Sequence, residues 1–439
     1  MDVRVLIVAP DDRLAGPLAE GLDRVGWRSI TARGAEAALA ALRDLHIEVV
    51  IVETGDNALD GLALAQALKA ARTPRRLPVV ALGRPDPLLE QMGFDLALSP
   101  PLHPAQAVLR LEALVRAAVA EEEFELRRET LAERGRTLVA PPSSPQPLKV
   151  LTIGEPAPKF VALAHALTAM GAEATAALTA YTAFDYMHEE PFDAVVLWAG
   201  ETHAEALSIA GGMRRNTRLF HIPTILYLRA GAEVELADAF NRGLADVATA
   251  DTPAEDTARR VISLARAYRR ETAIRQALEQ ARSSGLMDAA TGLFTGELFA
   301  AHLSRLARAS RERGRDLSVA VLRIADRPET TIARHKGWLD RAIPQIGSMI
   351  GRLVRAEDTA ARLAPEVFAL ALPAAAAGAG RIAAERIAAV IACTAFEAGD
   401  GRPPFTIEFE LGVAELEPGE TAARTLERAA ARAAPRQTA

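Results

Sequence analysis

Short continuous runs of apolar residues alternate with amphipathic stretches along the first part of the chain, and the runs recur in the same order in a second segment. Continuous apolar runs are typical of strands buried in a parallel sheet, and the amphipathic stretches between them predict helices on the sheet faces. Each copy ends with a further short strand, at 96–99 and 246–249, and a helix. The pattern predicts two flavodoxin-like α/β domains in tandem. The matching runs are VRVLIVAP (3–10) with LKVLTIGEP (148–156), IEVVIVE (47–53) with FDAVVLW (192–198), and LPVVALG (77–83) with IPTILYL (222–228).

Two helical stretches and one spacer connect these copies to the rest of the chain. A charged helical pattern covers 105–137, and the prolines and serines of APPSSPQP (140–147) then stop the helix and mark a boundary. A second helical pattern covers 253–282. Its apolar stripe predicts packing on its own domain or on a partner helix, and a dimerising stalk is the alternative. The stripe comprises Val261, Leu264, Tyr268, Ile274 and Leu278.

The last segment mixes helices and strands without the βα repeat. Strands are expected at Leu317–Ile324, Val367–Leu372 and Phe405–Val413, which indicates an α+β domain. The chain of 439 residues is long enough for three domains with separate cores. The expected domains are 1–139, 148–282 with its C-terminal helix, and 286–436.

Charge and composition exclude several classes of protein. The 51 Lys+Arg residues face 57 Asp+Glu residues, which leaves no basic excess for a nucleic acid or an anionic membrane surface. No uncharged apolar run reaches the ~18–20 residues of a membrane-spanning helix, and the N-terminus lacks the pattern of a signal peptide. We therefore expect a cytoplasmic protein with no membrane insertion. The histidines show no metal-ligand spacing, and Cys393 lies in an apolar helical run that predicts packing.

The two repeated segments resemble response-regulator receiver domains, the CheY-like family. In that family an Asp at the end of the third strand accepts a phosphoryl group beside a Mg²⁺ ion held by an acidic pair after the first strand. Here the acceptor positions hold Glu53 and Trp198, and the acidic-pair positions of the first copy hold Ala9 and Pro10. The resemblance thus implies two degenerate receivers that serve docking and dimerisation.

Some features of these receivers leave alternatives open. Glu53 either imitates a phosphorylated Asp or marks a decayed site, and Trp198 is expected to fill the former pocket by packing. Asp11 and Asp12 either hold a metal weakly or favour the start of a helix.

The last segment resembles the GGDEF domain of diguanylate cyclases. Asp288–Leu293 reads D-A-A-T-G-L, close to the opening D-x-L-T-G-L of that family. Arg362–Ala369 aligns with the family's R-Y-G-G-D-E-F-A, so the signature positions hold Ala364, Pro365, Glu366, Val367 and Phe368. Both glycines that let backbone approach GTP phosphate are absent, and Pro365 also lacks an N–H donor.

A further position argues against cyclase activity. Arg323 stands where the family has its first metal-binding carboxylate, and a guanidinium repels Mg²⁺ instead of coordinating it. The resemblance therefore implies a catalytically inactive GGDEF domain with no catalytic residues, no bound metal and no cofactor.

One functional feature of the family persists. Diguanylate cyclases carry an inhibitory product site, R-x-x-D, and Arg355–Asp358 occupies the same spacing before the signature. Arg386 falls where the family places a second product-site arginine. By this resemblance the ligand is cyclic di-GMP, bound through Arg355, Asp358 and Arg386. Arg can donate two hydrogen bonds to guanine O6 and N7, and Asp can accept from the guanine N–H groups. The alternative is a surface Arg–Asp pair at a helix end.

The domain order and the losses together resemble the PopA-like family of cyclic di-GMP effectors, which share the receiver–receiver–GGDEF order of PleD-type cyclases. That resemblance implies a non-catalytic, homodimeric receptor recruited to a cell pole. Its implied partners are the adaptors RcdA and CpdR, the regulator CtrA and the protease ClpXP, in regulated proteolysis during the cell cycle. The alternatives are a residual diguanylate cyclase, or a ligand-independent scaffold controlled through the first receiver.

Overall fold

The computed structural model describes residues 4–54, 61–83, 93–98, 103–138, 146–216, 218–280, 286–399 and 401–433. The chain divides into two compact units, which are described one at a time. The tandem unit joins Asp2–Ala118 with Pro142–Ala273, and the C-terminal unit joins Val119–Pro141 with Ile274–Ala439. The division falls inside a helix, ahead of the boundary at 139 that the sequence suggests.

The first domain of the tandem unit is a parallel five-stranded sheet with the strand order β2-β1-β3-β4-β5. This order is that of flavodoxin-like folds. The strands predicted from the three apolar runs and at 96–99 are confirmed, and their side chains are almost wholly buried. The elements are β1 (Arg4–Val8), α1 (Asp12–Arg24), β2 (Arg28–Ala32), α2 (Ala35–Asp44), β3 (Val49–Glu53), α3 (Gly61–Ala70), β4 (Val79–Leu82), β5 (Leu96–Leu98) and α4 (Pro104–Ala132).

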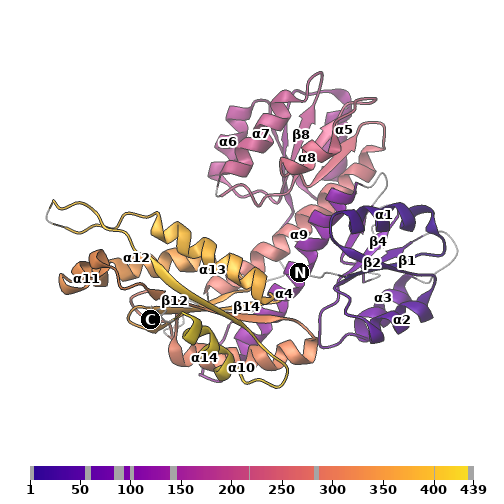
Figure 1. The fold of residues 1–439 in the computed structure, drawn as a ribbon. Helices are drawn as coiled ribbons and strands as arrows, with labels where there is room; N and C mark the ends of the chain where they lie inside the picture. The colour runs from indigo at the N-terminus through magenta and orange to yellow at the C-terminus, as the bar shows by residue number, and fades with distance from the viewer. Residues whose placement is uncertain are drawn as a thin grey trace. The chain divides into compact units, whose positions relative to one another are not determined.

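The second domain repeats this arrangement, with the strand order β10-β9-β8-β6-β7 in a second parallel sheet. In the opposite direction this order is β7-β6-β8-β9-β10, which corresponds strand by strand to β2-β1-β3-β4-β5 of the first domain. Its elements are β6 (Lys149–Ile153), α5 (Pro158–Ala169), β7 (Glu173–Ala177), α6 (Ala180–Glu189), β8 (Ala194–Ala199), α7 (Ala204–Arg215), β9 (Thr224–Leu228), α8 (Leu236–Asn241), β10 (Asp246–Thr249) and α9 (Ala254–Gln280). Figure 1 shows helices on both faces of each sheet.

The helix predicted at 253–282 is confirmed as α9, and its apolar stripe packs within its own chain. Val261 and Leu264 lie in the core of the second domain. Ile274 lies in a core of the C-terminal unit. The side chain of Leu278 is outside the described residues. At these three positions the stripe is therefore buried within the chain.

A buried carboxylate joins the two domains of the tandem unit. Asp246 of β10 is fully buried and lies 2.7 Å from Arg110 and 2.5 Å from Arg260. The amide of Gln106 donates to the same carboxylate at 2.5 Å. Gln106 and Arg110 come from α4, whereas Arg260 comes from α9. Because a buried carboxylate is costly unless it is paired, this contact specifies how α4 packs on the second domain.

The C-terminal unit contains a third five-stranded sheet in the order β11-β13-β14-β12-β15, with β12 antiparallel to both of its neighbours. The strand predicted at Leu317–Ile324 is confirmed as β12, and the other two predicted strands correspond to β14 and β15. In Figure 1, α12 and α13 cover one face of this sheet, and α10 and α14 cover the other. The elements are β11 (Phe294–Thr295), α10 (Gly296–Arg313), β12 (Leu317–Ile324), α11 (Pro328–His335), α12 (Trp338–Leu353), β13 (Thr359–Ala364), β14 (Val367–Pro373), α13 (Ala377–Ala392), β15 (Phe409–Glu415) and α14 (Ala422–Arg432).

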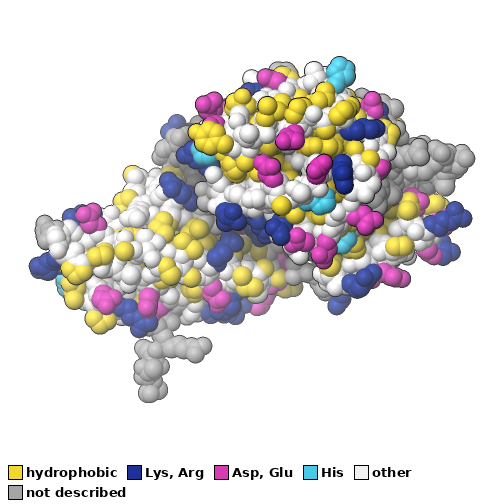
Figure 2. Space-filling view, turned by 90° about the horizontal axis from the view of Figure 1, so that it is seen from above, with side chains coloured by type: hydrophobic (Ala, Val, Ile, Leu, Met, Phe, Trp, Pro, Cys, Tyr) yellow, Lys and Arg dark blue, Asp and Glu magenta, His cyan; other side chains and the backbone are white. Residues whose placement is uncertain are grey.

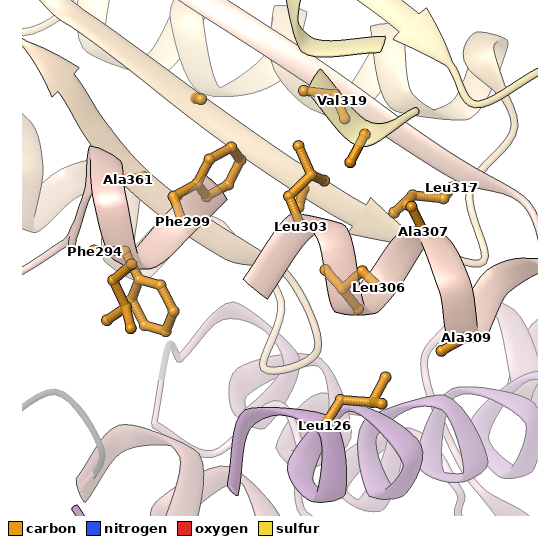
Figure 3. Packing of buried hydrophobic residues seen from close by; sticks show 14 of the residues in the cluster. Leu126, Phe294, Phe299, Leu303, Leu306, Ala307, Ala309, Leu317, Val319 and Ala361 are labelled. Carbon is orange, nitrogen blue, oxygen red and sulfur yellow. The ribbon is translucent and has the colours of Figure 1, made fainter. Parts of the chain in front are cut away.

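The second half of α4 is part of the C-terminal core. Ala120, Phe124 and Leu126 of α4 are buried in one cluster with Leu298, Leu303 and Leu306 of α10 and with β12. Figure 3 shows Leu126 facing the side of α10 that carries Leu306 and Ala309. α10 therefore buries one side against the sheet and another against α4.

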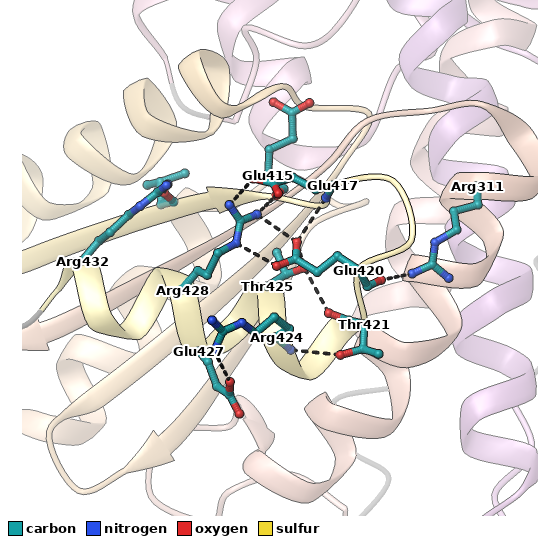
Figure 4. A network of polar contacts seen from close by, with 11 residues as sticks. Arg311, Glu415, Glu417, Glu420, Thr421, Arg424, Thr425, Glu427, Arg428 and Arg432 are labelled. Atoms are coloured by element: carbon teal, nitrogen blue, oxygen red, sulfur yellow. Dashed lines mark hydrogen bonds and ion pairs between the residues drawn. The ribbon is translucent and has the colours of Figure 1, made fainter.

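An ion-pair network fastens the last helix to the sheet (Figure 4). Arg428 of α14 pairs with Glu420 at 2.8 Å and also with Glu417, and it donates to the backbone carbonyl of Glu415 at 2.5 Å. Thr421 caps α14 by accepting from the N–H of Arg424. Arg428 and Glu420 are partly buried and Glu417 is exposed, and the network holds α14 on β15.

The molecular surface in Figure 2 carries basic and acidic side chains interspersed with apolar ones. Among the described residues, no helix is long and apolar enough to cross a membrane.

Candidate ligand site

The signature positions lie on the hairpin between β13 and β14. Pro365 and Glu366 form its turn, and Val367 and Phe368 begin β14 opposite Arg323 and Leu322 of β12. Ala364 ends β13 and follows an irregularity in the strand pairing. Phe368 is fully buried. Of the five signature residues, only Glu366 has a polar side chain.

An arginine holds the surviving signature carboxylate. Arg334 of α11 donates through Nε and Nη2 to the two oxygens of Glu366, both at 2.7 Å, and also reaches Asp326 at 3.0 Å. These hydrogen bonds and charges raise the pKa of Arg334 above its usual value. A two-point Arg–carboxylate pair is among the strongest ionic contacts in proteins. Glu366 therefore faces a cation of the protein itself.

The position that the GGDEF resemblance assigns to a metal-binding carboxylate is also cationic. Arg323 lies near the end of β12, and its Nε is buried without a hydrogen-bond partner among the described residues. Beyond the same strand, Arg327 pairs with Glu408 at 2.8 Å. Within the described ranges, no group of three His, Cys, Asp or Glu residues is arranged to hold a metal ion.

The D-A-A-T-G-L segment forms a compact turn ahead of β11. Asp288 accepts from the backbone N–H of Thr291 at 3.0 Å and from its hydroxyl at 2.6 Å, and Arg362 lies 3.4 Å away. Burial acts to raise the pKa of Asp288, but the Thr291 hydrogen bonds and the Arg362 charge outweigh it and lower that pKa. The carboxylate is thus committed to local structure.

Arg355 and Asp358 share one short loop between α12 and β13. The side chain of Arg355 is 58% exposed, and its Nη1 lies 4.0 Å from Oε1 of Glu357. The carboxylate of Asp358 accepts from the backbone N–H of Arg355 at 2.9 Å, and among the described residues no ion pair joins it to the Arg355 guanidinium. The structure therefore does not contain the Arg355–Asp358 ion pair that the sequence leaves open as the alternative to a ligand site.

The environment of Asp358 disfavours its ionised form. Burial is the larger cause, and the negative charge of Glu357 adds to it, so that the pKa of Asp358 rises to about 7. The charge of Glu123 acts in the same direction, and the hydrogen bond and charge of Arg355 oppose it. Asp358 can therefore change its charge near neutral pH.

Arg386 lies on α13 with its side chain exposed and without a hydrogen bond or ion pair to any described residue. α13 packs along α12, the helix that leads into the Arg355 loop. The structure records no contact between Arg386 and either Arg355 or Asp358. The first two residues are thus brought together by the fold, and the third lies on the neighbouring helix.

The positions that the resemblance to receiver domains assigns to the phosphoacceptor lie at the carboxyl ends of β3 and β8. Glu53 is half-buried, and burial, with the nearby charge of Asp11, raises its pKa. Trp198 stacks on Phe160 at a ring distance of 5.4 Å and contacts Tyr227 at the same distance. Trp198 thus packs as the sequence predicts. Pro100, which the resemblance to receiver domains places at the position of that family's lysine after the fifth strand, lies outside the described residues.

Sequence reasoning missed a set of polar residues beside the Arg355 loop. Arg127 of α4 donates to the carbonyl of Asp358 at 3.4 Å and to the hydroxyl of Thr359 at 2.9 Å. Glu123, one turn earlier, pairs with Arg127 at 2.7 Å. The sequence offered one signal, a charged i,i+4 pair within an otherwise packed helix, but nothing in it indicates what that pair contacts.

Comparisons with known proteins assign a family to the last segment. Residues 285–436 match the family "Diguanylate cyclase, GGDEF domain". No curated protein matches the chain. Similar solved structures include the GGDEF domain of DgcB from Caulobacter crescentus in complex with c-di-GMP, with 27% identity over 34% of this chain and 84% of that one and a TM-score of 0.31.

Two further solved structures are similar to part of the chain. The coiled coil and GGDEF domain of DgcB with c-di-GMP is 27% identical over 39% of this chain and 90% of that one, with a TM-score of 0.32. Diguanylate cyclase SiaD from Pseudomonas aeruginosa, in complex with its activator SiaC, is 24% identical over 40% of this chain and 67% of that one, with a TM-score of 0.32. At residues 285–436 the chain therefore carries a GGDEF domain of the diguanylate cyclase family.

Proposed function

We propose that this chain is a non-catalytic receptor for cyclic di-GMP, which binds the dinucleotide through Arg355 and Asp358 of its GGDEF domain. The observation that carries the proposal is a contrast between two sites in one domain. The carboxylate left in the signature is held by an arginine, whereas the Arg355 guanidinium is exposed beside a carboxylate that it does not pair with.

Two features argue against turnover of GTP. Two-metal phosphoryl transfer needs carboxylates that are free to coordinate cations. Glu366 and Asp326 both face Arg334, and Arg323 puts a further positive charge at the metal position. The proposed function therefore involves no catalytic residues, no metal and no cofactor.

The Arg355 loop suits a guanine base. A guanidinium can donate two hydrogen bonds to guanine O6 and N7, and this pairing discriminates between bases by about 1–3 kcal/mol. Asp358 can accept from the N1–H and amino groups of the same base when it is ionised. Arg386, on the adjacent helix, is the candidate for stacking on a base or holding a phosphate. The DgcB structures are complexes of GGDEF domains with the same dinucleotide.

The wider role follows from the resemblance to PopA-like effectors. We propose that the two α/β domains are degenerate receivers and that the protein acts as a homodimer in the cytoplasm, recruited to a cell pole. Its proposed partners are RcdA, CpdR, CtrA and ClpXP. A pull-down of purified RcdA with and without cyclic di-GMP tests this role, and retention that ignores the ligand would leave the scaffold alternative instead.

Calorimetric titration with cyclic di-GMP tests the receptor function. We expect micromolar or tighter binding by the wild-type protein and loss of binding in Arg355→Ala. Arg352→Ala is the matched control, because Arg352 is an exposed arginine in the last turn of α12 and, among the described residues, makes no hydrogen bond or ion pair with the Arg355 loop. No heat of binding in the wild-type protein, or equal losses in the two variants, would reject the receptor.

A further inference from the structure

A buried polar cluster ties α4 to the strand that follows the proposed ligand site. We call it the Glu123 cluster, and it comprises Glu123, Arg127, Thr130, His302 and Thr359. Glu123 and His302 are at most 1% exposed, and Nε2 of His302 lies 2.8 Å from Oε1 of Glu123. Thr359 donates to the same oxygen at 3.1 Å. All five residues belong to the C-terminal unit.

Arg127 connects this cluster to the loop that carries Arg355 and Asp358. Its Nη2 donates to the Thr359 hydroxyl at 2.9 Å and to the Asp358 carbonyl at 3.4 Å. Its Nε and Nη2 also donate to Glu123, and its guanidinium lies 5.6 Å from the ring centre of Phe294. Arg127 is nearly fully buried, so each of these contacts persists without competition from water.

We propose that Arg127 is a positioning residue for the dinucleotide site, holding the backbone of Asp358 and the side chain of Thr359 from a helix outside the GGDEF family match. The inference rests on the proposed function, since it names what orients the Asp358 carboxylate toward the ligand. A group that fixes the end of a short loop fixes the direction of the side chain at that end, and a misplaced acceptor loses its hydrogen bonds to a guanine edge.

The charges around Asp358 also affect its protonation. Arg355 and Glu357 face it from its own loop, Glu123 and Arg127 belong to α4, and His302 of α10 contacts Glu123. The negative charge of Glu123 opposes ionisation of Asp358. Removing that charge is expected to make the acceptor form available at lower pH.

The test compares two arginines that fasten the same helix. Arg127→Met is expected to weaken cyclic di-GMP binding by about tenfold or more, within the range of ordinary coupling between sites. Arg305→Met is the control, because Arg305 pairs with Glu129 at 2.7 Å and donates to Thr130 at 3.1 Å without touching residues 358 and 359. The control is expected to bind the ligand as the wild-type protein does.

Two further variants separate positioning from loss of fold. Arg127→Lys keeps a positive charge opposite Glu123 but offers a single donor group, and it is expected to lose about 2–10-fold in affinity, the equivalent of one hydrogen bond. If Arg127→Met fails to fold by circular dichroism, this variant carries the comparison. Glu123→Gln is expected to shift the pH midpoint of binding downward, and Arg305→Met is expected to leave the midpoint in place.

The outcomes distinguish this inference from the receptor proposal. Undiminished binding in both Arg127 variants, or equal losses in the Arg127 and Arg305 variants, overturns the positioning role while the receptor stands. An unmoved midpoint in Glu123→Gln also counts against it. Absence of binding in the wild-type protein overturns the receptor and the positioning role together.

Discussion

Acidification is expected to weaken cyclic di-GMP binding through a single carboxylate. Asp358 has a pKa of about 7 in the folded protein, and it accepts hydrogen bonds from a guanine edge only when it is ionised. Burial and the charge of Glu357 are the causes, so the effect belongs to the folded loop. Above about pH 8 the site is ready to bind, and at pH 7 about half of the molecules carry a proton there.

The magnitude follows from the titration of one group. Below its pKa, the ionised fraction falls about tenfold per pH unit, so the apparent Kd is expected to rise about tenfold per unit below pH 7. The effect on stability has the opposite sign. Because the folded pKa lies above the ordinary aspartate value of 3.8, Asp358 contributes stability that is complete below that value and is lost as the pH rises through about 7.

Calorimetric titration between about pH 6 and about pH 8 measures this dependence, with Asp358→Asn as the control. The variant is expected to bind weakly and with little dependence on pH, because its amide does not titrate. A wild-type Kd that is the same at both ends of the range would refute the assignment of Asp358 as the base acceptor.

The remaining predictions concern stability and catalysis. Asp246→Asn is expected to lower the free energy of unfolding by about 3–5 kcal/mol in urea denaturation, because Arg110 and Arg260 lose their shared counterion. The control is Asp238→Asn in an exposed ion pair, which should change the free energy of unfolding by no more than about 1 kcal/mol. Equal effects of the two substitutions would contradict the buried pairing. Gly412→Ala should destabilise the C-terminal unit by about 1–3 kcal/mol, since its Cβ would lie 2.0 Å from the carbonyl oxygen of Ala429, and Gly378→Ala, with open space around it, should not. Prolonged incubation with GTP and Mg²⁺ is expected to yield no cyclic di-GMP from the wild-type protein or from Arg323→Asp, because Pro365 remains in both. Product from either protein would instead support the alternative of a residual diguanylate cyclase.

The central strands that the sequence predicts in the first two domains are buried on both faces. β1, β3 and β4 and their counterparts read as apolar runs because every side chain meets a helix layer. The edge strands β2 and β7 do not follow this pattern, since RSITA and EATAA are polar or small and only partly buried. β13 was missed for a related reason, because TAARLA has little apolar volume.

The side chains of the site were harder to predict than its position. Spacing and resemblance pointed to Arg355 and Asp358, but the pairing of Glu366 with Arg334 joins two residues far apart in the chain. The prediction that Cys393 is packed is wrong, because it ends α13 on the exposed side. An apolar run places a residue on a helix, and only the tertiary packing decides which side of that helix is covered.

The placement of α4 has a practical consequence for dissecting this protein. A fragment cut at the family boundary, beginning near residue 286, would lack Phe124, Leu126 and Leu131, which cover the outer side of α10. It would expose Leu306 to water and leave His302 without the carboxylate of Glu123. Poor solubility of such a fragment would therefore report a missing helix, and expression vectors for the isolated C-terminal unit should splice residues 119–138 ahead of it.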